Sequence, residues 1–380
     1  MNAQFRSSTF DAVKAEAFAE NLLATLNTGG LALMISIGHR TRLFDVMAQL
    51  EPSTSQQIAD TANLQERYVR EWLNALTVGG ILEYQVETQA YYLPTEHAAF
   101  LSRHAGADNL ATFFQHISGL AMVEDAIVQC FSKGGGVPYE AFSRFHEVMA
   151  EDSGQTVVPA LESAILPLVP GLIERLTQGI EVLDVGCGSG RAMNRLAQLF
   201  PASHFTGYDF SVEAIATATA EAKAHGLHNV RFQIQDAAQI AEVERYDLIT
   251  TFDAIHDQAQ PDLVLRNIYT ALKPNGGVYL MQEIRAASNV SENLDHPVAP
   301  FLYTISCMHC MTVSLAAGGM GLGTMWGREM AWEMLHLTGF ESIERKESPH
   351  DIMNDFYILR KGASGKELSD VSALQFGELG

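Results

Sequence analysis

The chain is poor in cationic side chains. Its 380 residues carry 24 Lys and Arg, of which only seven are Lys, against 45 Asp and Glu, so the formal net charge is −21. Proteins that bind nucleic acids use Lys and Arg to neutralise phosphates, and this imbalance argues against that class. An acidic, Lys-poor surface is strongly solvated, and a salt-adapted host is one hypothesis that explains it.

Cysteine and long apolar runs are also scarce. Four Cys cannot supply a disulfide framework for a chain of this length. The N-terminal residues include acids and lack the apolar core of a signal peptide, and the run from Leu31 to Ile37 is too short to cross a bilayer. We therefore expect a cytoplasmic protein that does not bind a membrane. Apolar residues make up 47% of the chain, which is enough to build sizeable cores.

The N-terminal residues have the pattern of a winged helix, in which three helices precede a β-hairpin. Such a domain can bind DNA through its third helix. Residues 1–100, however, carry six Lys and Arg against eleven Asp and Glu. We therefore predict that residues 1–105 form a mainly helical domain that serves dimerisation and caps a substrate site. The expected elements are helices at about 35–50, 56–61 and 64–78 and a hairpin at 81–92.

Further helices are expected between residues 106 and 178. Helices that join two domains commonly line the cleft between them, so Phe114 and His116 are candidates for substrate contact. We interpret Gly134-Gly135-Gly136 as a flexible connection, because no strand precedes it and no Gly-Lys-Ser/Thr follows it.

From residue 179 onward, strands and helices alternate, and this predicts a parallel α/β sheet. The expected strand from Ile180 to Val185 leads directly into Gly186-Cys187-Gly188-Ser189-Gly190, and a helix begins at about Arg191. This geometry presents backbone N–H groups and a helix N-terminus to a ligand. Acids stand at the ends of consecutive predicted strands, where ligands bind in open α/β sheets: Asp184, Asp209, Asp236 and Asp253.

Two cofactors compete for this site, a dinucleotide and S-adenosylmethionine. The glycine spacing does not fit the dinucleotide fingerprint G-x-G-x-x-G, because Arg191 stands where its third Gly belongs. Asp184 would repel a pyrophosphate but would attract a cationic sulfonium with an α-amino group. S-adenosylmethionine is therefore the favoured cofactor.

The segments VLDVGCGSG, GYDFS, QDA, TFDAIHD and LKPNGG resemble the successive motifs of class I S-adenosylmethionine-dependent methyltransferases. The resemblance covers residues 179–361. It implies a catalytic domain at 179–362, ahead of a tail at 363–380, with a Rossmann-like sheet that is mostly parallel and ends in an antiparallel hairpin. It also implies S-adenosylhomocysteine as product and no metal. The cofactor-binding residues that it implies are Asp184, Gly186, Gly188, Gly190, Asp209, Phe210, Asp236, Ala237 and Phe252.

The same resemblance assigns roles within this set. The three glycines approach the methionine moiety and Asp184 helps to hold its amino end. Asp209 holds the ribose, and Asp236 with Ala237 meets the adenine.

A winged helix and linking helices ahead of this fold look like small-molecule O-methyltransferases, which form homodimers through that region. Their catalytic His stands in a His-Asp pair after the fourth strand, where this chain has His256 and Asp257. Gln258 replaces the Trp that usually follows. We therefore expect His256 to be the general base, with its ring oriented by Asp257 or Asp253.

The segment from Ala299 to Gly327 is an insertion that commonly covers the methyl acceptor in this fold. It contains no Lys, Arg, Asp or Glu, so it suits a small, soft, weakly charged acceptor. Cys307 and Cys310 are too few for a structural zinc site, and on a helix both would lie on one face. We interpret Gly318 to Gly323 as a hinge or lid loop. Candidate substrate contacts are Phe114, His116, Tyr303, Met308, His309, Trp326 and Arg328.

The motif TFDAIHDQAQP together with this insertion is similar to a subgroup of winged-helix methyltransferases linked to thiol methylation. Some of these enzymes convert hydrogen sulfide and methanethiol to dimethyl sulfide. The resemblance implies an S-methyltransferase of a small thiol, with the thiolate as nucleophile. Two alternatives stay open: an O-methyltransferase with a phenolic acceptor, and a regulator that uses the winged helix. The acidic N-terminal residues and the complete cofactor motifs disfavour the regulator.

Overall fold

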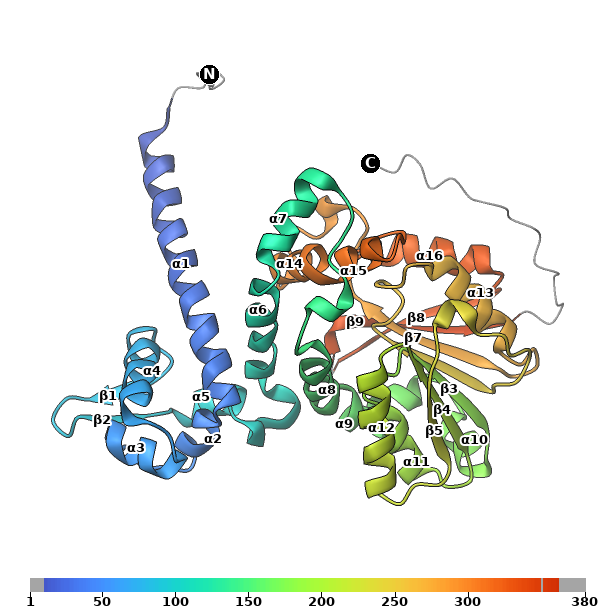
Figure 1. Ribbon diagram of the computed structural model, residues 1–380, viewed down its shortest axis with the longest axis horizontal. Helices are drawn as coiled ribbons and strands as arrows, with labels where there is room; N and C mark the ends of the chain where they lie inside the picture. The colour runs from blue at the N-terminus through green and yellow to red at the C-terminus, as the bar shows by residue number, and fades with distance from the viewer. Residues whose placement is uncertain (1–9, 350, 362–380) are drawn as a thin grey trace. The chain divides into compact units, whose positions relative to one another are not determined.

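The computed structural model describes residues 10–349 and 351–361. The chain divides into two compact units, one up to Ser118 and one from Gly119 onward (Figure 1). The helices expected between residues 106 and 178 are shared between these units. The predicted tail at 363–380 lies outside the described residues.

The first unit is a helical domain with a small hairpin, as the winged-helix pattern predicts. Helix α3 begins with a capping box, because the side chain of Thr54 accepts from the N–H of Gln57 while the Gln57 side chain accepts from the N–H of Thr54. Helix α4 carries two cations, but Arg67 pairs with Glu71 and Arg70 with Glu66. The elements are α1 (Ala12–Arg40), α2 (Leu43–Met47), α3 (Ser55–Ala62), α4 (Glu66–Val78), β1 (Glu83–Gln85), β2 (Ala90–Tyr92) and α5 (Thr95–Leu101), followed by α6 (Phe114–Ala121).

The helix predicted at about 35–50 is wrong in its extent. Helix α1 is 29 residues long, and the chain breaks before α2 at Arg42, whose φ is 61°. Leu22, Leu23 and Leu26 are exposed in the first half of α1, so no core-facing stripe marks that half in the sequence. Contrary to the short apolar run expected, α1 is long and apolar enough to cross a bilayer by length and composition, and so is the segment Ala299–Ala316.

The second unit is built on a seven-stranded sheet that is mostly parallel, as predicted, with strand order β5-β4-β3-β6-β7-β9-β8. Only β9 runs antiparallel to its two neighbours, which forms the expected C-terminal hairpin with β8. The chain order reverses between β3 and β6, and ligands bind at such a switch point in open sheets. The strands are β3 (Glu181–Val185), β4 (His204–Asp209), β5 (Val230–Ile234), β6 (Leu248–Phe252), β7 (Val278–Ile284), β8 (Ser342–Ser348) and β9 (Asp351–Arg360).

Alternate side chains of the central strands fill a core on each face of this sheet. Leu183 and Val185 of β3 pack with α13 and α16, whereas Val182 packs with α10 and α11. The helices are α7 (Glu124–Lys133), α8 (Phe145–Gln155), α9 (Val157–Ala160), α10 (Leu172–Gln178), α11 (Arg191–Leu199), α12 (Val212–Ala224), α13 (Pro261–Ala271), α14 (Ala299–Ile305), α15 (Met311–Ala316) and α16 (Gly327–Thr338), with a π-helical turn, η8 (Ser306–Cys310), between α14 and α15.

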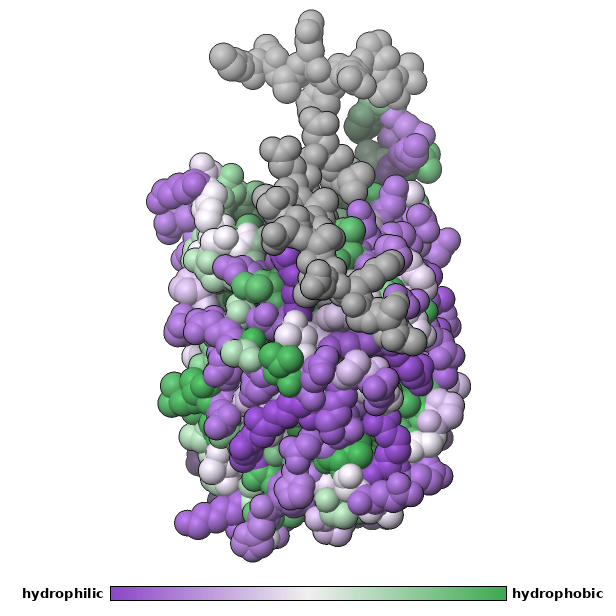
Figure 2. Space-filling model, turned by 90° about the vertical axis from the view of Figure 1, so that its right-hand side faces the viewer, coloured by the Kyte–Doolittle hydropathy of each residue, from purple (hydrophilic) through white to green (hydrophobic). Residues whose placement is uncertain are grey.

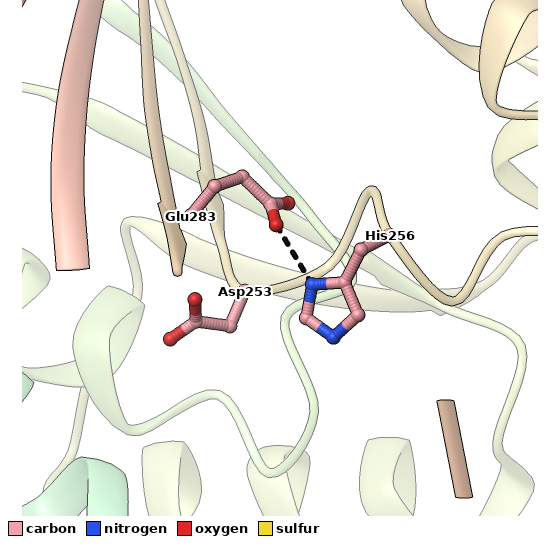
Figure 3. Close-up of side chains that lie close together, drawn as sticks. All are labelled: Asp253, His256 and Glu283. Carbon is pink, nitrogen blue, oxygen red and sulfur yellow. Dashed lines mark hydrogen bonds and ion pairs between the residues drawn. The ribbon is translucent and has the colours of Figure 1, made fainter. Parts of the chain in front are cut away.

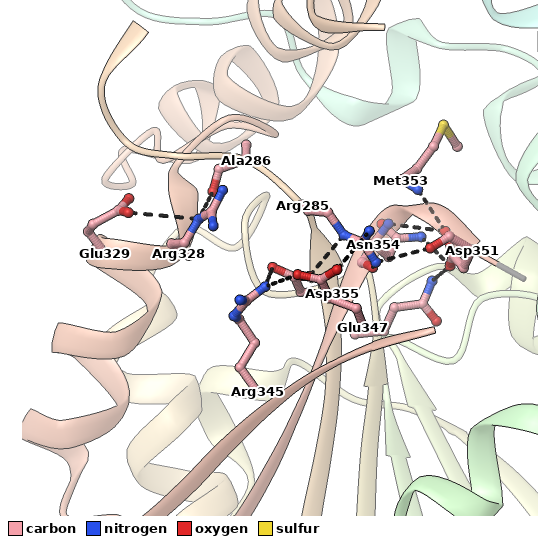
Figure 4. A network of polar contacts seen from close by, with 11 residues as sticks. Arg285, Ala286, Arg328, Glu329, Arg345, Glu347, Asp351, Met353, Asn354 and Asp355 are labelled. Atoms are coloured by element: carbon pink, nitrogen blue, oxygen red, sulfur yellow. Dashed lines mark hydrogen bonds and ion pairs between the residues drawn. The ribbon is translucent and has the colours of Figure 1, made fainter. Parts of the chain in front are cut away.

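The antiparallel end of the sheet is fixed by a buried ion pair network (Figure 4). Asp355 of β9 is 0% exposed and accepts hydrogen bonds from Arg285 and Arg345, each at 3.0 Å. A buried carboxylate is tolerated when it is paired in this way. The network therefore fixes the end of β7 relative to β8 and β9, and with it the position of Gln282 and Glu283.

Gly136 is packed more tightly than a flexible connection requires. A Cβ atom there would lie 1.9 Å from the carbonyl oxygen of Thr312, and the N–H of Val137 donates to Oγ1 of Thr312 at 2.8 Å. The Gly-rich segment after α7 is therefore anchored to α15 at its last residue, and the interpretation of Gly136 as part of a loose connection is wrong.

One face of the outer surface is mostly polar. Figure 2 shows a face that is largely hydrophilic, with hydrophobic side chains scattered in small groups. Scattered apolar side chains are ordinary on folded proteins. The remaining polar groups of interest lie at the ends of the strands.

Candidate active site

The glycine-rich loop follows β3 at the switch point of the sheet. Gly186 has φ 74°, and a Cβ there would lie 2.6 Å from Cβ of Ala254, so only Gly lets the loop after β6 pack this closely. Gly188 has φ 51°, and a Cβ there would meet nothing within 4 Å. A Cβ at Gly190 would instead meet the ring of Phe232 at 2.5 Å. Gly186 and Gly190 thus serve packing, while Gly188 opens toward a ligand.

Asp209, at the end of β4, holds this loop in place. Its carboxylate accepts from the backbone N–H groups of Gly188 and Ser211, both at 2.8 Å. Burial raises the pKa of Asp209, and these two hydrogen bonds act in the opposite direction. Phe210 follows with 52% of its surface exposed, and the ring of Tyr139 packs edge-on against it at 5.2 Å.

Four further residues predicted to bind the cofactor lie at the same edge of the sheet. Asp184 is buried and accepts from the hydroxyl of Thr250 at 2.7 Å. Burial raises the pKa of Asp184 to about 7. Asp236 is exposed, and its carboxylate accepts from the N–H of Ala238 at 2.9 Å, which caps the short turn that contains Ala237. Phe252 ends β6 and is half-buried.

A buried pair of side chains, Glu283 and His256, lies at the ends of β7 and β6 (Figure 3). Oε2 of Glu283 lies 2.7 Å from Nδ1 of His256, and the two side chains are 1% and 6% exposed. Glu283 is itself held by the N–H of Ile255 at 2.9 Å and by Nε1 of Trp326 at 3.2 Å. Glu283 therefore fixes the imidazole ring through Nδ1, and Nε2 is the ring nitrogen that Glu283 does not engage.

Glu283 also determines the electrostatics of the pair. Burial lowers the pKa of His256, but the charge of Glu283 and the contact with Cys310 outweigh burial, and the pKa is raised well above its usual value. Burial raises the pKa of Asp257 to about 6, and the charge of His256 opposes this shift. The hypothesis that Asp257 or Asp253 orients the ring is wrong, because Glu283 makes that hydrogen bond.

Asp253 adopts a backbone conformation that is unusual for a residue other than Gly. Its φ is 51°, and its N–H donates to the carbonyl of Gln282 at 3.0 Å. Asp253, His256 and Glu283 offer ligand atoms within 4.8 Å of one another and could hold a metal ion. One nitrogen and two carboxylates suit a divalent transition metal, although Glu283 already engages Nδ1. The expectation of a metal-free site stays a prediction.

The π-helical turn η8 brings Cys310 to this pair. Cys310 is buried and makes a side-chain hydrogen bond with His256. Cys307 is only partly buried. The expectation that both Cys lie on one face assumes an α-helix, and the π-helical turn changes that spacing.

His309 of the same turn lies in an aromatic cluster. Its ring stacks on Phe145 with 3.6 Å between centroids and 10° between planes. Phe142 and Tyr139 contact it edge-on at 4.6 and 5.3 Å. Met308 packs beside this cluster, next to Val313 and Ile305.

The remaining predicted substrate residues make contacts of their own, and their role in binding an acceptor stays a prediction. Nε1 of the buried Trp326 donates to Glu283. Tyr303 accepts from the amide of Asn293 at 3.0 Å, and Arg328 donates to the carbonyl of Ala286 at 3.4 Å (Figure 4). Phe114 and His116 belong to the first unit, where burial lowers the pKa of His116 to about 4.

The Gly-rich segment from Gly318 to Gly323 braces the loop that carries His256. The N–H of Gly323 donates to the carbonyl of His256 at 3.1 Å, and the N–H of Met320 donates to that of Ala259 at 3.0 Å. A Cβ at Gly319 would lie 2.3 Å from Cα of Ala259. The hinge or lid interpretation is therefore replaced by a supporting role, in which glycines allow two backbones to pack together.

Sequence reasoning missed the residue that engages His256. Glu283 ends a strand that reads VYLMQEI and is otherwise mostly apolar, and a lone acid in a buried strand is a usable signal. The sequence gives Cys310 no role beyond sharing a predicted helix face with Cys307. Asp152 on α8 precedes the cofactor motifs, so nothing in the sequence indicates a role for it at the site. Burial raises the pKa of Asp152 to about 7.

Comparison with known proteins agrees with this two-part architecture. Residues 29–103 match an Rv2258c-like winged HTH domain, and residues 176–326 match a methyltransferase domain. A malonyl-[acyl-carrier protein] O-methyltransferase of Bacillus cereus is 29% identical over 160 residues, 41% of this chain and 52% of that protein. An arsenite methyltransferase of Aquipseudomonas alcaligenes is 38% identical over 113 residues, 27% of this chain and 33% of that protein. The chain thus spans about half or less of these two relatives.

Solved structures share the fold over nearly the whole chain. The mitomycin 7-O-methyltransferase MmcR has a TM-score of 0.66 at 16% identity, covering 92% of this chain and 100% of its own. Human N-acetylserotonin methyltransferase in complex with SAM has a TM-score of 0.62 at 17% identity, covering 94% and 99%. The chain is therefore a two-domain protein, with a winged helix-turn-helix domain followed by a methyltransferase domain.

Proposed function

We propose that the protein is an S-adenosylmethionine-dependent methyltransferase that acts on a hydroxyl group of a small, uncharged acceptor. The observation that carries this proposal is the buried pair Glu283–His256 at the strand ends beside the glycine-rich loop. A positioned imidazole with a fixed tautomer is what a general base requires.

The residues at the switch point fit this cofactor. Gly188 leaves open space at its Cα, and Asp209 retains lone pairs that can accept ribose hydroxyls. Asp184 is buried and Asp253 is half-buried with one buried oxygen, and burial raises the pKa of both carboxyl groups, so positive charge nearby would relieve that cost. Bound here, S-adenosylmethionine supplies a methyl group on a cationic sulfonium that needs no further activation.

The task left to the chain is to place the acceptor and remove its proton. Nε2 of His256 would accept the hydroxyl proton that the acceptor oxygen releases when it takes the methyl group. The carboxylate of Glu283 stabilises the resulting imidazolium. A cationic neighbour also lowers the pKa of His256, which favours the neutral ring that can accept a proton.

The charges around the site favour a neutral acceptor. The ionisable groups that shift the pKa values of Asp253, His256 and Asp257 are Asp, Glu, His and Cys side chains. An anionic acceptor would therefore meet uncompensated negative charge. The structural neighbour MmcR is a mitomycin 7-O-methyltransferase, which supports oxygen as the acceptor atom. Thiol methylation, like homodimer formation and a cytoplasmic location, stays a prediction.

The test is a product assay with a panel of acceptors. The purified protein is incubated with S-adenosylmethionine and catechol, a monophenol, sulfide or methanethiol, and S-adenosylhomocysteine is quantified. We expect turnover with a hydroxyl acceptor and its loss in His256→Ala. Turnover with the thiols alone would overturn the choice of oxygen, and failure to bind S-adenosylhomocysteine would overturn the function itself.

A further inference from the structure

Helix α8 contributes to the site from outside the cofactor motifs, since it precedes the matched methyltransferase region. A Cβ atom at Gly154 would lie 2.6 Å from the guanidinium of Arg191, which is the first residue of α11, directly after the glycine-rich loop. At the other end of α8, His146 acts electrostatically on Asp209. Helix α8 therefore lies beside both the loop and the end of β4.

Three buried oxygen atoms at this edge have no hydrogen-bond donor. They are Oδ1 of Asp152 on α8, Oδ1 of Asp253 after β6 and Oε1 of Gln282 on β7, and no polar group of residues 10–349 or 351–361 donates to them. Gln282 is 2% exposed, and its Nε2 lies 3.3 Å from the carboxylate of Asp253 and 3.5 Å from that of Asp351. The Gln282 amide is therefore directed into a cluster of carboxylates.

Two carboxylates of this cluster, those of Asp152 and Asp253, lack a hydrogen-bond donor for one oxygen. Asp351 is satisfied within the fold, because its Oδ1 accepts from the N–H groups of Met353 and Asn354, both at 3.0 Å. Asp152 and Asp253 each keep a buried oxygen without a donor, and such an oxygen costs free energy unless a ligand supplies one. Burial, followed by neighbouring charges that include those of Asp351 and Asp152, raises the pKa of Asp253.

An ammonium group fits the cluster better than a metal ion. Among the described residues, the grouped metal-ligand atoms belong to Asp253, His256 and Glu283, and Asp152 is not among them. An ammonium group instead donates in three directions to acceptors about 2.9 Å away. Asp253 is followed by Ala254, which packs against Gly186, so an ammonium bound here lies next to the glycine-rich loop.

We propose that Asp152 and Asp253, together with the side-chain oxygen of Gln282, bind the α-ammonium group of S-adenosylmethionine and S-adenosylhomocysteine. This assignment rests on the proposed function and adds a residue from a helix that the methyltransferase motifs do not contain. It also shifts the principal ammonium contact away from Asp184, whose carboxylate is bonded to Thr250.

The test compares two ligands that differ only at the ammonium group. Calorimetry measures the binding of S-adenosylhomocysteine and of its desamino analogue, which has hydrogen in place of the α-amino group, to wild type and Asp152→Asn. We expect wild type to bind the analogue about 10- to 100-fold more weakly, as for loss of a charged hydrogen bond. Asp152→Asn should weaken S-adenosylhomocysteine by about 10-fold but leave the analogue within about two-fold. Glu147→Gln, on the same helix and paired with Arg144 at the surface, is the matched control.

Thermal unfolding of the ligand-free variants separates binding from a structural role. Because Asp152→Asn removes a buried charge that lacks a donor, its melting temperature should equal or exceed that of wild type. Equal weakening of both ligands, no weakening of either, or a lower melting temperature would overturn the assignment. If wild type binds neither ligand, both the proposed function and the assignment of Asp152 fail. The other contrary outcomes overturn only the assignment of Asp152.

Discussion

Replacing Glu283 by Gln should uncouple His256 from its fixed tautomer with little change to the shape of the site. The change removes the charge that lies 2.7 Å from Nδ1. In wild type the carboxylate of Glu283 accepts from the N–H groups of Ile255, Trp326 and His256. In the Gln variant one of these donors faces the amide nitrogen and loses its acceptor. Loss of one buried hydrogen bond costs about 1–3 kcal/mol, so the fold should persist.

The size of the electrostatic effect follows from the distance. With the two charges centred about 4 Å apart and an effective dielectric constant of about 20, their attraction is about 4 kcal/mol. Burial then dominates and lowers the pKa of His256, so the ring should lose its proton at a lower pH than in wild type.

Two measurements check this prediction. The NMR titration of His256, assigned by comparison with His256→Gln, should move to lower pH in Glu283→Gln. The rate constant kcat should fall by about 10²- to 10⁴-fold, as when the acid that fixes a catalytic His is neutralised, while the affinity for S-adenosylhomocysteine stays nearly constant. A His256 titration within about half a unit of wild type would refute the electrostatic reasoning.

The other predictions concern the base, a packed glycine and pH. His256→Ala should lower kcat by about 10²- to 10⁴-fold with a nearly unchanged dissociation constant for S-adenosylhomocysteine, and an unchanged kcat would remove His256 as the base. Gly136→Ala should reduce the free energy of unfolding by about 1–3 kcal/mol, because its Cβ would lie 1.9 Å from the backbone of Thr312. Urea titration checks this against Gly119→Ala, where a Cβ meets nothing within 4 Å. Burial raises the pKa of Asp184 from 3.8 to about 7, so the folded state binds its proton more tightly and stability should fall as pH rises from about 4 to about 7. Between about pH 4 and about pH 7 the free energy of unfolding of Asp184→Asn should change by up to about 4 kcal/mol less than that of wild type. Identical urea midpoints for wild type and variant at every pH would contradict the raised pKa of Asp184.

The strand ends could be predicted because the signal for them is local. The apolar strand β3 ends at Val185, as predicted, and is followed at once by Gly186, while Asp209 ends β4 and Asp253 directly follows β6. The hydrogen bond between His256 and Glu283 could not be predicted from a local sequence signal. The two are 27 residues apart and meet because β6 and β7 are neighbours, while Asp253 turns away at a positive φ.

The contribution of helices was harder to predict than that of strands. The first half of α1 carries apolar residues on exposed positions, so periodicity did not reveal it. The contact of Cys310 with His256 depends on a π-helical turn, which no spacing rule for α-helices anticipates. Asp152 reaches the site only through packing of α8 beside the start of α11.

The buried carboxylate of Asp355 bears on how the protein responds to salt. The Debye length is about 3 Å in 1 M salt, so repulsion among the exposed acids of this chain, whose net charge is −21, weakens strongly there. Asp355 is 0% exposed, so its bonds to the partly exposed Arg285 and Arg345 should be screened less than the ion pairs between exposed side chains. High salt should therefore weaken the repulsion between exposed acids more than it weakens the ion pairs that hold the β8–β9 hairpin. The free energy of unfolding should rise with salt because of the surface charges.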